Sequence, residues 1–153
     1  MKVHELMNPR AVMVEPKTPL RQILRLMLRY HLNDILVVDR EQRLAGIVTY
    51  SDLSRKLLPT PEELIEHEEY IDSPESMEDR FKDFADLPVG EIMTKNVITV
   101  SPDDEALHAG ATMTARRVKQ LPVVRDRKVI GIIGRSDIGW GLMMQYAECM
   151  KIG

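Results

Sequence analysis

The sequence repeats itself once, and this duplication constrains the fold more than any other feature. Residues 3–7, Val-His-Glu-Leu-Met, align with residues 89–93, Val-Gly-Glu-Ile-Met, at an offset of 86 positions. After one deleted residue the match resumes at an offset of 85, where residues 46–52 align with residues 131–137. Two copies at this long period indicate a duplicated domain with two pseudo-symmetric halves, and not a solenoid.

Each repeat predicts the same order of elements. A short strand comes first, a helix with apolar residues on one face follows, and two buried strands lead into a final helix. The strands are expected at 11–14, 35–38 and 44–48 in the first repeat, and at 97–100, 121–124 and 129–133 in the second.

The helices are predicted from apolar spacing and capping residues. Thr18 is the expected N-cap of the first helix, with Pro19 as its first residue, and the matching helix spans about 103–117. The final helices are expected to be capped by Ser51 or Asp52 and by Ser136 or Asp137, with the second continuing through Met150. The residues expected to face inward are Leu20, Ile23, Leu24, Met27 and Leu28, then Ala106, Leu107, Gly110 and Met113.

These elements predict an α/β (α+β) fold of two pseudo-symmetric β-α-β-β-α repeats packed through their sheets. Neither repeat, at roughly 50 to 60 residues, buries a large core alone. We expect repeat 1 at 1–58, an acidic, partly helical insert at 59–88, and repeat 2 at 89–153 with an extended C-terminal helix.

The insert concentrates negative charge. Segment 54–88 carries eleven acids against four bases, a net charge of −7, which leaves +4 on the rest of the chain. A short acidic helix is expected at 62–70 and another turn or two at 76–84. The acidic face is either solvated, a docking surface for a basic partner, or a lid. Its apolar residues are expected to cover the core or a dimer contact: Leu64, Ile65, Tyr70, Ile71, Met77, Phe81, Phe84 and Leu87.

Four motifs at consistent spacing carry a family resemblance. They are Glu-Ile-Met-Thr at 91–94, Ile-Thr-Val at 98–100, Leu-Pro-Val-Val at 121–124 and Gly-Ile-Ile-x-x-Ser-Asp at 131–137. This pattern resembles the CBS domain, named after cystathionine β-synthase, and two in tandem resemble a CBS pair, or Bateman module. The resemblance implies two clefts between the sheets that bind adenosyl ligands such as AMP, ADP, ATP or S-adenosylmethionine. It also implies association into a disc-like homodimer and a regulatory role, here in a stand-alone pair.

The first repeat keeps the ribose motif of this family intact, as Gly46, Thr49, Ser51 and Asp52. A carboxylate can accept hydrogen bonds from both ribose hydroxyls, and hydroxyls and amides at a helix start can hold phosphate. By analogy with related modules, basic residues from the other repeat reach the phosphates. Ser51 and Asp52 could instead be helix caps only, and the arginines a solvated helix end. The residues assigned to site 1 are Val12, Met13, Leu36, Thr49, Ser51, Asp52, Arg116 and Arg117.

The second repeat departs from the motif. Gly134 stands where a hydroxyl residue is expected, and Arg135 could supply a phosphate contact in its place. Asp34 would repel phosphate, so the first cleft is favoured for a phosphorylated ligand. Leu36 replaces the usual proline. The residues assigned to site 2 are Ile98, Thr99, Pro122, Arg135, Ser136, Asp137 and His31.

Composition and the remaining motifs exclude other classes. No apolar run approaches the roughly 20 residues of a membrane span, and no secretory signal begins the chain, so we expect a cytoplasmic protein. The four histidines lack metal-ligand spacing, and Cys149 is expected to be an inert thiol. No catalytic constellation is present, so we expect no enzyme and no catalytic cofactor. With few aromatic residues and a net charge of −3, nucleic acid is not an expected partner.

The sequence thus predicts a non-enzymatic sensor that binds an adenosyl ligand and transmits its state to a partner protein. The final helix offers an exposed stripe for homodimer formation, at Ile138, Leu142, Met143 and Tyr146 with Trp140. The alternative is a ligand-free interaction module that acts through its dimer surface and acidic insert.

Overall fold

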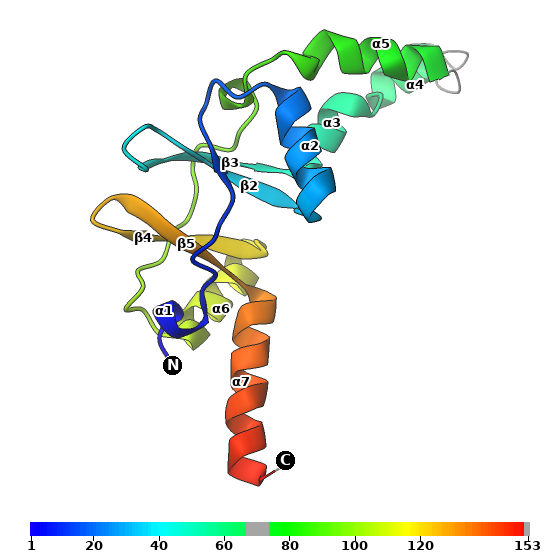
Figure 1. Cartoon of the computed structure of the whole chain (residues 1–153). Coiled ribbons are helices and arrows are strands. Elements are labelled where there is room, and N and C mark those ends of the chain that lie inside the picture. Colours follow the sequence, from blue (N-terminus) through cyan, green and yellow to red (C-terminus); the bar gives the residue numbers. More distant parts are fainter. Residues whose placement is uncertain (67–73, 152–153) are drawn as a thin grey trace. The chain divides into compact units, whose positions relative to one another are not determined.

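The structure is a computed structural model that describes residues 1–66 and 74–151, with side chains of the second range described from residue 78 on. It is a mixed α/β fold of helices and small sheets (Figure 1). The elements in chain order are α1 (Val3–Leu6), β1 (Met13–Val14), α2 (Leu20–Tyr30), β2 (Asp34–Val38), β3 (Leu44–Thr49), α3 (Tyr50–Leu57), α4 (Pro61–Glu66), α5 (Pro74–Ala85), η2 (Val89–Glu91), α6 (Ala106–Arg116), β4 (Gln120–Arg125), β5 (Lys128–Gly134) and α7 (Arg135–Met150).

The chain divides into two compact units. The first-repeat unit comprises Met13–Arg40 and Ala45–Lys95. The second-repeat unit comprises Met1–Val12, Glu41–Leu44 and Asn96–Gly153. Each unit is built mainly from one repeat, but the leading segment of that repeat lies in the other unit.

The first-repeat unit is built on a three-stranded sheet in the order β1-β2-β3. β1 pairs with β2 in parallel, with Met13 opposite Leu36 and Val14 opposite Val37. β2 reads Asp-Ile-Leu-Val-Val and is buried from Ile35 onward, as expected for an apolar run covered on both faces. α2 packs against β2 through Leu20, Ile23 and Met27, which recur at helical spacing.

The second-repeat unit is built on the antiparallel hairpin β4-β5. Arg125 pairs with Lys128 across a two-residue turn, Asp126-Arg127, whose φ angles of 51° and 66° are both positive. Such a turn matches the right-handed twist of a hairpin. The strands pack with α6 and α7 around an aliphatic core of Val3, Val100, Ala106, Ala109, Met113, Leu121, Val123, Ile133 and Ile138.

The leading segment of each repeat packs in the unit of the other repeat. Residues 1–12, with α1, lie in the second-repeat unit, and residues 89–95, with η2, lie in the first-repeat unit. Asn8 and Ile132 exchange backbone hydrogen bonds of 2.8 and 3.0 Å, and Thr94 and Ile47 exchange bonds of 2.8 and 3.0 Å. These two pairs correspond through the repeat offset, so the exchange is reciprocal and pseudo-symmetric.

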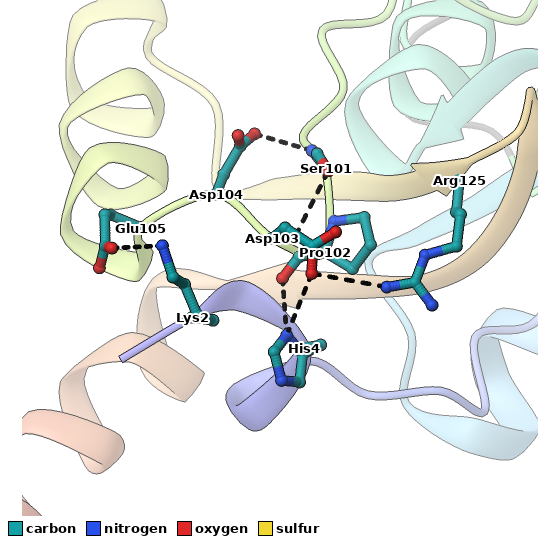
Figure 2. A network of polar contacts seen from close by, with 8 residues as sticks. All are labelled: Lys2, His4, Ser101, Pro102, Asp103, Asp104, Glu105 and Arg125. Carbon is teal, nitrogen blue, oxygen red and sulfur yellow. Dashed lines mark hydrogen bonds and ion pairs between the residues drawn. The ribbon is translucent and has the colours of Figure 1, made fainter.

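Polar contacts fasten α1 to the loop before α6 (Figure 2). Lys2 pairs with Glu105, and this hydrogen bond lowers the pKa of Glu105 and raises the pKa of Lys2. His4 Nδ1 lies 2.9 Å from the carbonyl oxygen of Pro102 and 3.8 Å from Asp103 Oδ1. These side chains are exposed, so the contacts set the position of α1 more than they add stability.

Within the same loop, Ser101 N donates to Asp104 Oδ2 at 2.8 Å, which closes a tight turn at the start of the segment (Figure 2). Arg125, from the end of β4, approaches Asp103 Oδ1 at 3.6 Å. The loop is therefore held from both the N-terminal segment and the hairpin.

The insert is described in two pieces. α4 begins with a reciprocal cap, because Thr60 N donates to Glu63 Oε2 at 2.7 Å and Glu63 N donates to Thr60 Oγ1 at 3.2 Å. Arg80 Nη2 on α5 lies 3.0 Å from the same Glu63 oxygen and links the two helices. The bond from Thr60 and the pairing with Arg80 lower the pKa of Glu63.

Several local predictions for the insert have mixed outcomes. Phe84 is buried, but Ile65 is 83% exposed and Leu64 and Phe81 are also exposed. Leu87 is half-buried. The acidic helix expected at 62–70 is described only over Pro61–Glu66. Tyr70, Ile71 and the side chain of Met77 lie outside the described residues.

Predicted helix details also need correction. Thr18 is not the cap of α2; Pro19 holds that position without a side-chain bond, and the helix begins at Leu20. Leu28 is 77% exposed and Leu107 is 65% exposed, because each lies one position off the buried stripe of its helix. Residues 97–99 form no regular strand, and only Val100 bridges to Val123 of β4.

Candidate functional site

Asp52 holds a capping position at the start of α3. Thr49 is the N-cap, and its hydroxyl accepts a hydrogen bond from Asp52 N at 3.2 Å. Asp52 Oδ2 in return accepts from Thr49 N at 2.9 Å and from Thr49 Oγ1 at 3.0 Å. The prediction that Ser51 or Asp52 is the N-cap was therefore wrong by two or three residues. This reciprocal capping box fixes the carboxylate relative to the strand end of β3.

Ser51 contributes exposed polar groups at the same helix start. Tyr50 N donates to the carbonyl of Asn33 at 2.7 Å, so the first amide of α3 is already satisfied. Among the described residues, none accepts a hydrogen bond from Ser51 N, and the Ser51 side chain is exposed. The amide and hydroxyl of Ser51 are therefore available donors at a helix N-terminus, where anions are favoured.

Arg55 contacts the second oxygen of the Asp52 carboxylate. Arg55 Nη2 lies 3.1 Å from Asp52 Oδ1, and Arg55 Nε donates to the Ser51 carbonyl at 3.2 Å. This contact was not predicted from the sequence. The spacing of three residues on one helix, acid before base, is the signal that could have identified it.

Two of the three apolar candidates of site 1, Met13 and Leu36, lie on the sheet of the same unit, whereas Val12 lies in the other unit. Met13 on β1 and Leu36 on β2 are register partners. Leu36 is buried, at 1% exposure, whereas Met13 is half-buried. Leu36 thus serves the core of its unit whatever else it contacts.

The second-repeat unit has the same helix start without the hydroxyl. Gly134 is the N-cap of α7, and Gly134 N donates to Asp137 Oδ2 at 2.7 Å. Glycine has no side chain to return the bond, so the box of α3 is only half formed here. Within residues 1–66 and 74–151, no atom accepts a hydrogen bond from the backbone amide of Ser136 or of Asp137. The loss of the hydroxyl therefore leaves more free donors than the first repeat has.

Arg135 is engaged inside its own unit. Its Nη2 atom donates to the carbonyls of Met113 at 3.3 Å and Val118 at 3.2 Å, near the end of α6. Lysine and arginine side chains commonly satisfy the last carbonyls of a helix in this way. Arg135 was expected to contact phosphate in place of the hydroxyl side chain that Gly134 lacks. That contact would require both of these hydrogen bonds to break.

Ile98, Thr99 and Pro122 lie along one edge of the second sheet. Val100 N donates to the Pro122 carbonyl at 3.0 Å, which places residues 98–99 directly before this edge contact. Pro122 is buried, Ile98 packs against the core, and Thr99 is exposed.

The basic candidates sit at corresponding helix ends. His31 follows α2 with φ 54°, and Arg117 follows α6 with φ 55°, so both adopt the left-handed conformation that glycine favours. Arg116 is the last residue of α6 and is exposed.

The assigned site residues fall in both units. Met13, Leu36, Thr49, Ser51 and Asp52 belong to the first-repeat unit, whereas Val12, Arg116 and Arg117 belong to the second. His31 belongs to the first-repeat unit, and the other site 2 residues belong to the second. The structure brings together Thr49 with Asp52, and Met13 with Leu36, within one unit.

The described residues contain no cluster of three or more histidine, cysteine, aspartate or glutamate side chains arranged to hold a metal ion. None of the helices in the described part of the chain is both long and apolar enough to span a bilayer.

Two units, each with an aspartate at the third position of the helix that follows its last strand, define a tandem α/β module. The chain belongs to the CBS domain family, whose profile matches residues 3–59 and 89–138. It carries this domain as a tandem pair.

Relatives and solved structures agree with this assignment. An uncharacterized protein of Methanocaldococcus jannaschii is 28% identical over 151 residues, covering 90% of this chain and 89% of the relative. Six other curated relatives are much longer, and the chain spans 16–25% of their length.

Two solved structures have the same fold. The structure of CBSX2 in complex with AMP matches with a TM-score of 0.73 at 22% identity, covering 95% of this chain and 98% of that one. The CBS domain pair of protein MJ0100, in complex with 5-methylthioadenosine and S-adenosyl-L-methionine, matches with a TM-score of 0.69 at 21% identity, over 95% and 98% of the two chains.

Proposed function

We propose that this chain is a non-enzymatic regulatory module that binds an adenosyl ligand and transmits its bound state to a partner protein. The observation that carries the proposal is the Asp52 carboxylate, fixed by the Thr49 capping box beside the free Ser51 donors. The fold supports it, since two CBS pairs of the same architecture were solved with AMP and with S-adenosylmethionine.

In site 1, Asp52 accepts hydrogen bonds from the ribose hydroxyls of the ligand. The backbone amide and the hydroxyl of Ser51 donate hydrogen bonds to phosphate at the positive end of the α3 helix dipole. Met13 and Leu36, with Val12, supply the apolar strand ends against which the base packs. By the family resemblance, Arg116 and Arg117 are the residues assigned to neutralise the phosphates.

Site 2 is the pseudo-symmetric counterpart. Asp137 takes the ribose role and Ser136 the phosphate role, while Ile98, Thr99 and Pro122 receive the base. His31 is the basic residue assigned to this site by the family resemblance. Arg135 stays on the carbonyls at the end of α6. Site 2 is the lower-affinity site for a phosphorylated ligand, because within the described residues His31 is the one assigned basic residue that is not already bonded to backbone carbonyls.

The regulatory mechanism is linkage between ligand and conformation. A ligand shifts a conformational equilibrium only by its differential affinity for the two states. The ligand favours the conformational state that binds it more tightly, and the partner protein recognises that state.

The proposal includes a homodimer formed through α7. Its outer face exposes Trp140, Met143, Met144, Tyr146 and Met150, each more than 60% exposed. Ile138 is buried in the core and Leu142 packs against it, so these two do not belong to the stripe predicted from the sequence. Methionine and aromatic residues are enriched at protein interfaces.

A thermal-shift panel with AMP, ADP, ATP, GTP and S-adenosylmethionine tests the ligand assignment. A ligand at 100 times its dissociation constant adds about 2.7 kcal/mol, which is several degrees for a chain of this size. We expect a shift with an adenosyl ligand that is lost in Asp52→Ala. Thr49→Ala is the matched control, because it breaks the same capping box but keeps the carboxylate.

The absence of any shift with all five compounds would overturn the ligand proposal. A shift that survives Asp52→Ala but disappears in Asp137→Ala would move the ligand to site 2. We expect the chain to be cytoplasmic, and affinity purification in the presence and absence of AMP identifies the regulated partner.

A further inference from the structure

We infer that Arg55 is an internal counterion of Asp52 that a bound nucleotide must displace, and that this exchange makes site 1 select phosphorylated adenosyl ligands over uncharged or cationic ones. The inference rests on the proposed function and narrows its ligand class. All the contacts that carry it lie within the first-repeat unit.

The hydrogen-bonding capacity of Asp52 is nearly used up without a ligand. A carboxylate oxygen has about two acceptor positions. Oδ2 already receives two bonds, from Thr49 N and Thr49 Oγ1. Oδ1 receives one bond, from Arg55 Nη2 at 3.1 Å. A ribose with two neighbouring hydroxyls therefore finds a single open acceptor position on Asp52 until Arg55 leaves.

Arg55 can leave at low cost. Its side chain is 75% exposed, whereas that of Asp52 is 12% exposed, so the arginine moves into solvent while the carboxylate stays in place. Exposed ion pairs contribute little to stability. The remaining contact, from Arg55 Nε to the Ser51 carbonyl, is also exposed and does not fix the side chain.

The destination of Arg55 depends on the charge of the ligand. A phosphate attached to the bound ribose lies close to Asp52 and Ser51, within reach of the arginine that it displaces. An arginine–phosphate pair restores the lost ion pair with a charge-assisted hydrogen bond. Adenosine, which lacks phosphate, leaves Arg55 without a partner. S-adenosylmethionine brings a positively charged sulfonium beside it, which the guanidinium repels.

The second repeat lacks this device. Asp137 is followed three positions later by Trp140, where the first repeat has Arg55. Among the residues that the structure describes, Asp137 has a contact on Oδ2 and none on Oδ1. Site 2 therefore has no internal counterion to displace and does not discriminate between ligands by this means.

Isothermal titration of the full chain with AMP, adenosine and S-adenosylmethionine tests the inference, in an Asp137→Asn background that isolates site 1. Asparagine can still accept the bond from Gly134 N, which preserves the start of α7. The variants are Arg55→Gln and, as matched control, Lys56→Gln, which removes the same charge one residue away from an exposed position of α3.

In Arg55→Gln, we expect adenosine to bind more tightly relative to AMP. The ratio of the adenosine dissociation constant to the AMP dissociation constant should fall by about five-fold or more, which is about 1 kcal/mol of relative binding free energy. S-adenosylmethionine also gains affinity relative to AMP. Lys56→Gln leaves both ratios within about two-fold, because an exposed charge without a fixed partner acts weakly.

Equal ratios in the parent and Arg55→Gln, or equal changes in Arg55→Gln and Lys56→Gln, would overturn the inference. In that case binding of AMP that is lost in Asp52→Ala would leave the proposed function standing. Failure of the parent chain to bind any of the three ligands would remove the proposed function and the inference with it.

Discussion

Asn8 and Ile132 exchange both of their backbone hydrogen bonds, and the repeat places the same exchange between Thr94 and Ile47. Each repeat therefore presents an edge of its sheet to the segment that leads into the other repeat. Each of these bonded pairs lies within one compact unit, so each unit is completed by a segment that leads into the other repeat.

The fastening requires glycine beside each bonded pair. A Cβ on Gly46 would lie 2.7 Å from both Met93 Sδ and the Thr94 carbonyl oxygen. Gly46→Ala should therefore cost about 1–3 kcal/mol of unfolding free energy, since the backbone oxygen cannot move without breaking the bond to Ile47. Urea unfolding measures the loss.

Gly139→Ala is the control for this substitution. Nothing lies within 4 Å of a Cβ at Gly139 on α7, and alanine is the better helix former there. It should gain about 0.5–1 kcal/mol. Equal stability of the Gly46→Ala variant and the parent would show that the leading segment is not held as described.

The capping box of α3 should have a measurable effect on stability. Thr49→Ala removes the hydroxyl that accepts from Asp52 N and donates to Asp52 Oδ2, and should cost about 1 kcal/mol. Thr49→Ser should retain most of that stability because it keeps the hydroxyl. Chemical denaturation distinguishes the two, and an alanine variant as stable as the serine variant would contradict the assignment of Thr49 as the N-cap.

Arg117 should show opposite effects on stability and binding. Its φ of 55° is left-handed, so Arg117→Gly relieves strain and should raise the free energy of unfolding by up to about 1 kcal/mol. The same change should weaken AMP binding, because the proposed phosphate contact is lost. His31→Gly, at the matching helix end with φ 54°, should gain similar stability without weakening site 1. Unchanged AMP affinity in Arg117→Gly would remove that residue from the site.

The ion pair between Lys2 and Glu105 predicts a specific pH dependence. The hydrogen bond from Lys2 holds the pKa of Glu105 below its ordinary value of 4.5. A carboxyl with a lowered folded-state pKa stabilises the fold above its unfolded-state value, and that stability is lost as pH falls through the folded-state pKa. The stability difference between the parent chain and Glu105→Gln should therefore be constant near neutral pH and shrink below about pH 4.5.

At alkaline pH, the stability contributed by the same ion pair changes with pH in the opposite direction. The hydrogen bond to Glu105 raises the pKa of Lys2 above 10.5, so its contribution is present below that pH and fades as pH rises through the folded-state value. Denaturation curves at several pH values measure both limits. A difference between parent and Glu105→Gln that does not vary with pH would show that the pair is absent in solution.

The repeat pattern predicted the main helices and five of the six expected strands, because apolar periodicity and turn residues are local properties of the chain, but residues 97–99 form no strand. Leu28 and Leu107 were placed in the core from spacing alone, and they are exposed because the buried stripe of each helix is narrower than the apolar pattern. The exchange of Asn8 with Ile132 could not be predicted, since it depends on pairing between segments far apart in sequence. At the candidate site, the aspartates were identified from the motif and the start of α3 at Tyr50 required coordinates, whereas the three-residue spacing of Asp52 and Arg55 was an overlooked signal for their contact.

Titration of AMP into the purified chain, its Asp52→Ala variant and its Thr49→Ala variant measures whether the Asp52 carboxylate holds the ligand. We expect saturable binding by the parent, binding weakened by no more than a few-fold in Thr49→Ala, and loss of site 1 binding in Asp52→Ala. Equal affinity in the parent and Asp52→Ala, with no site lost, would contradict the claim that the carboxylate at the start of α3 receives the ribose.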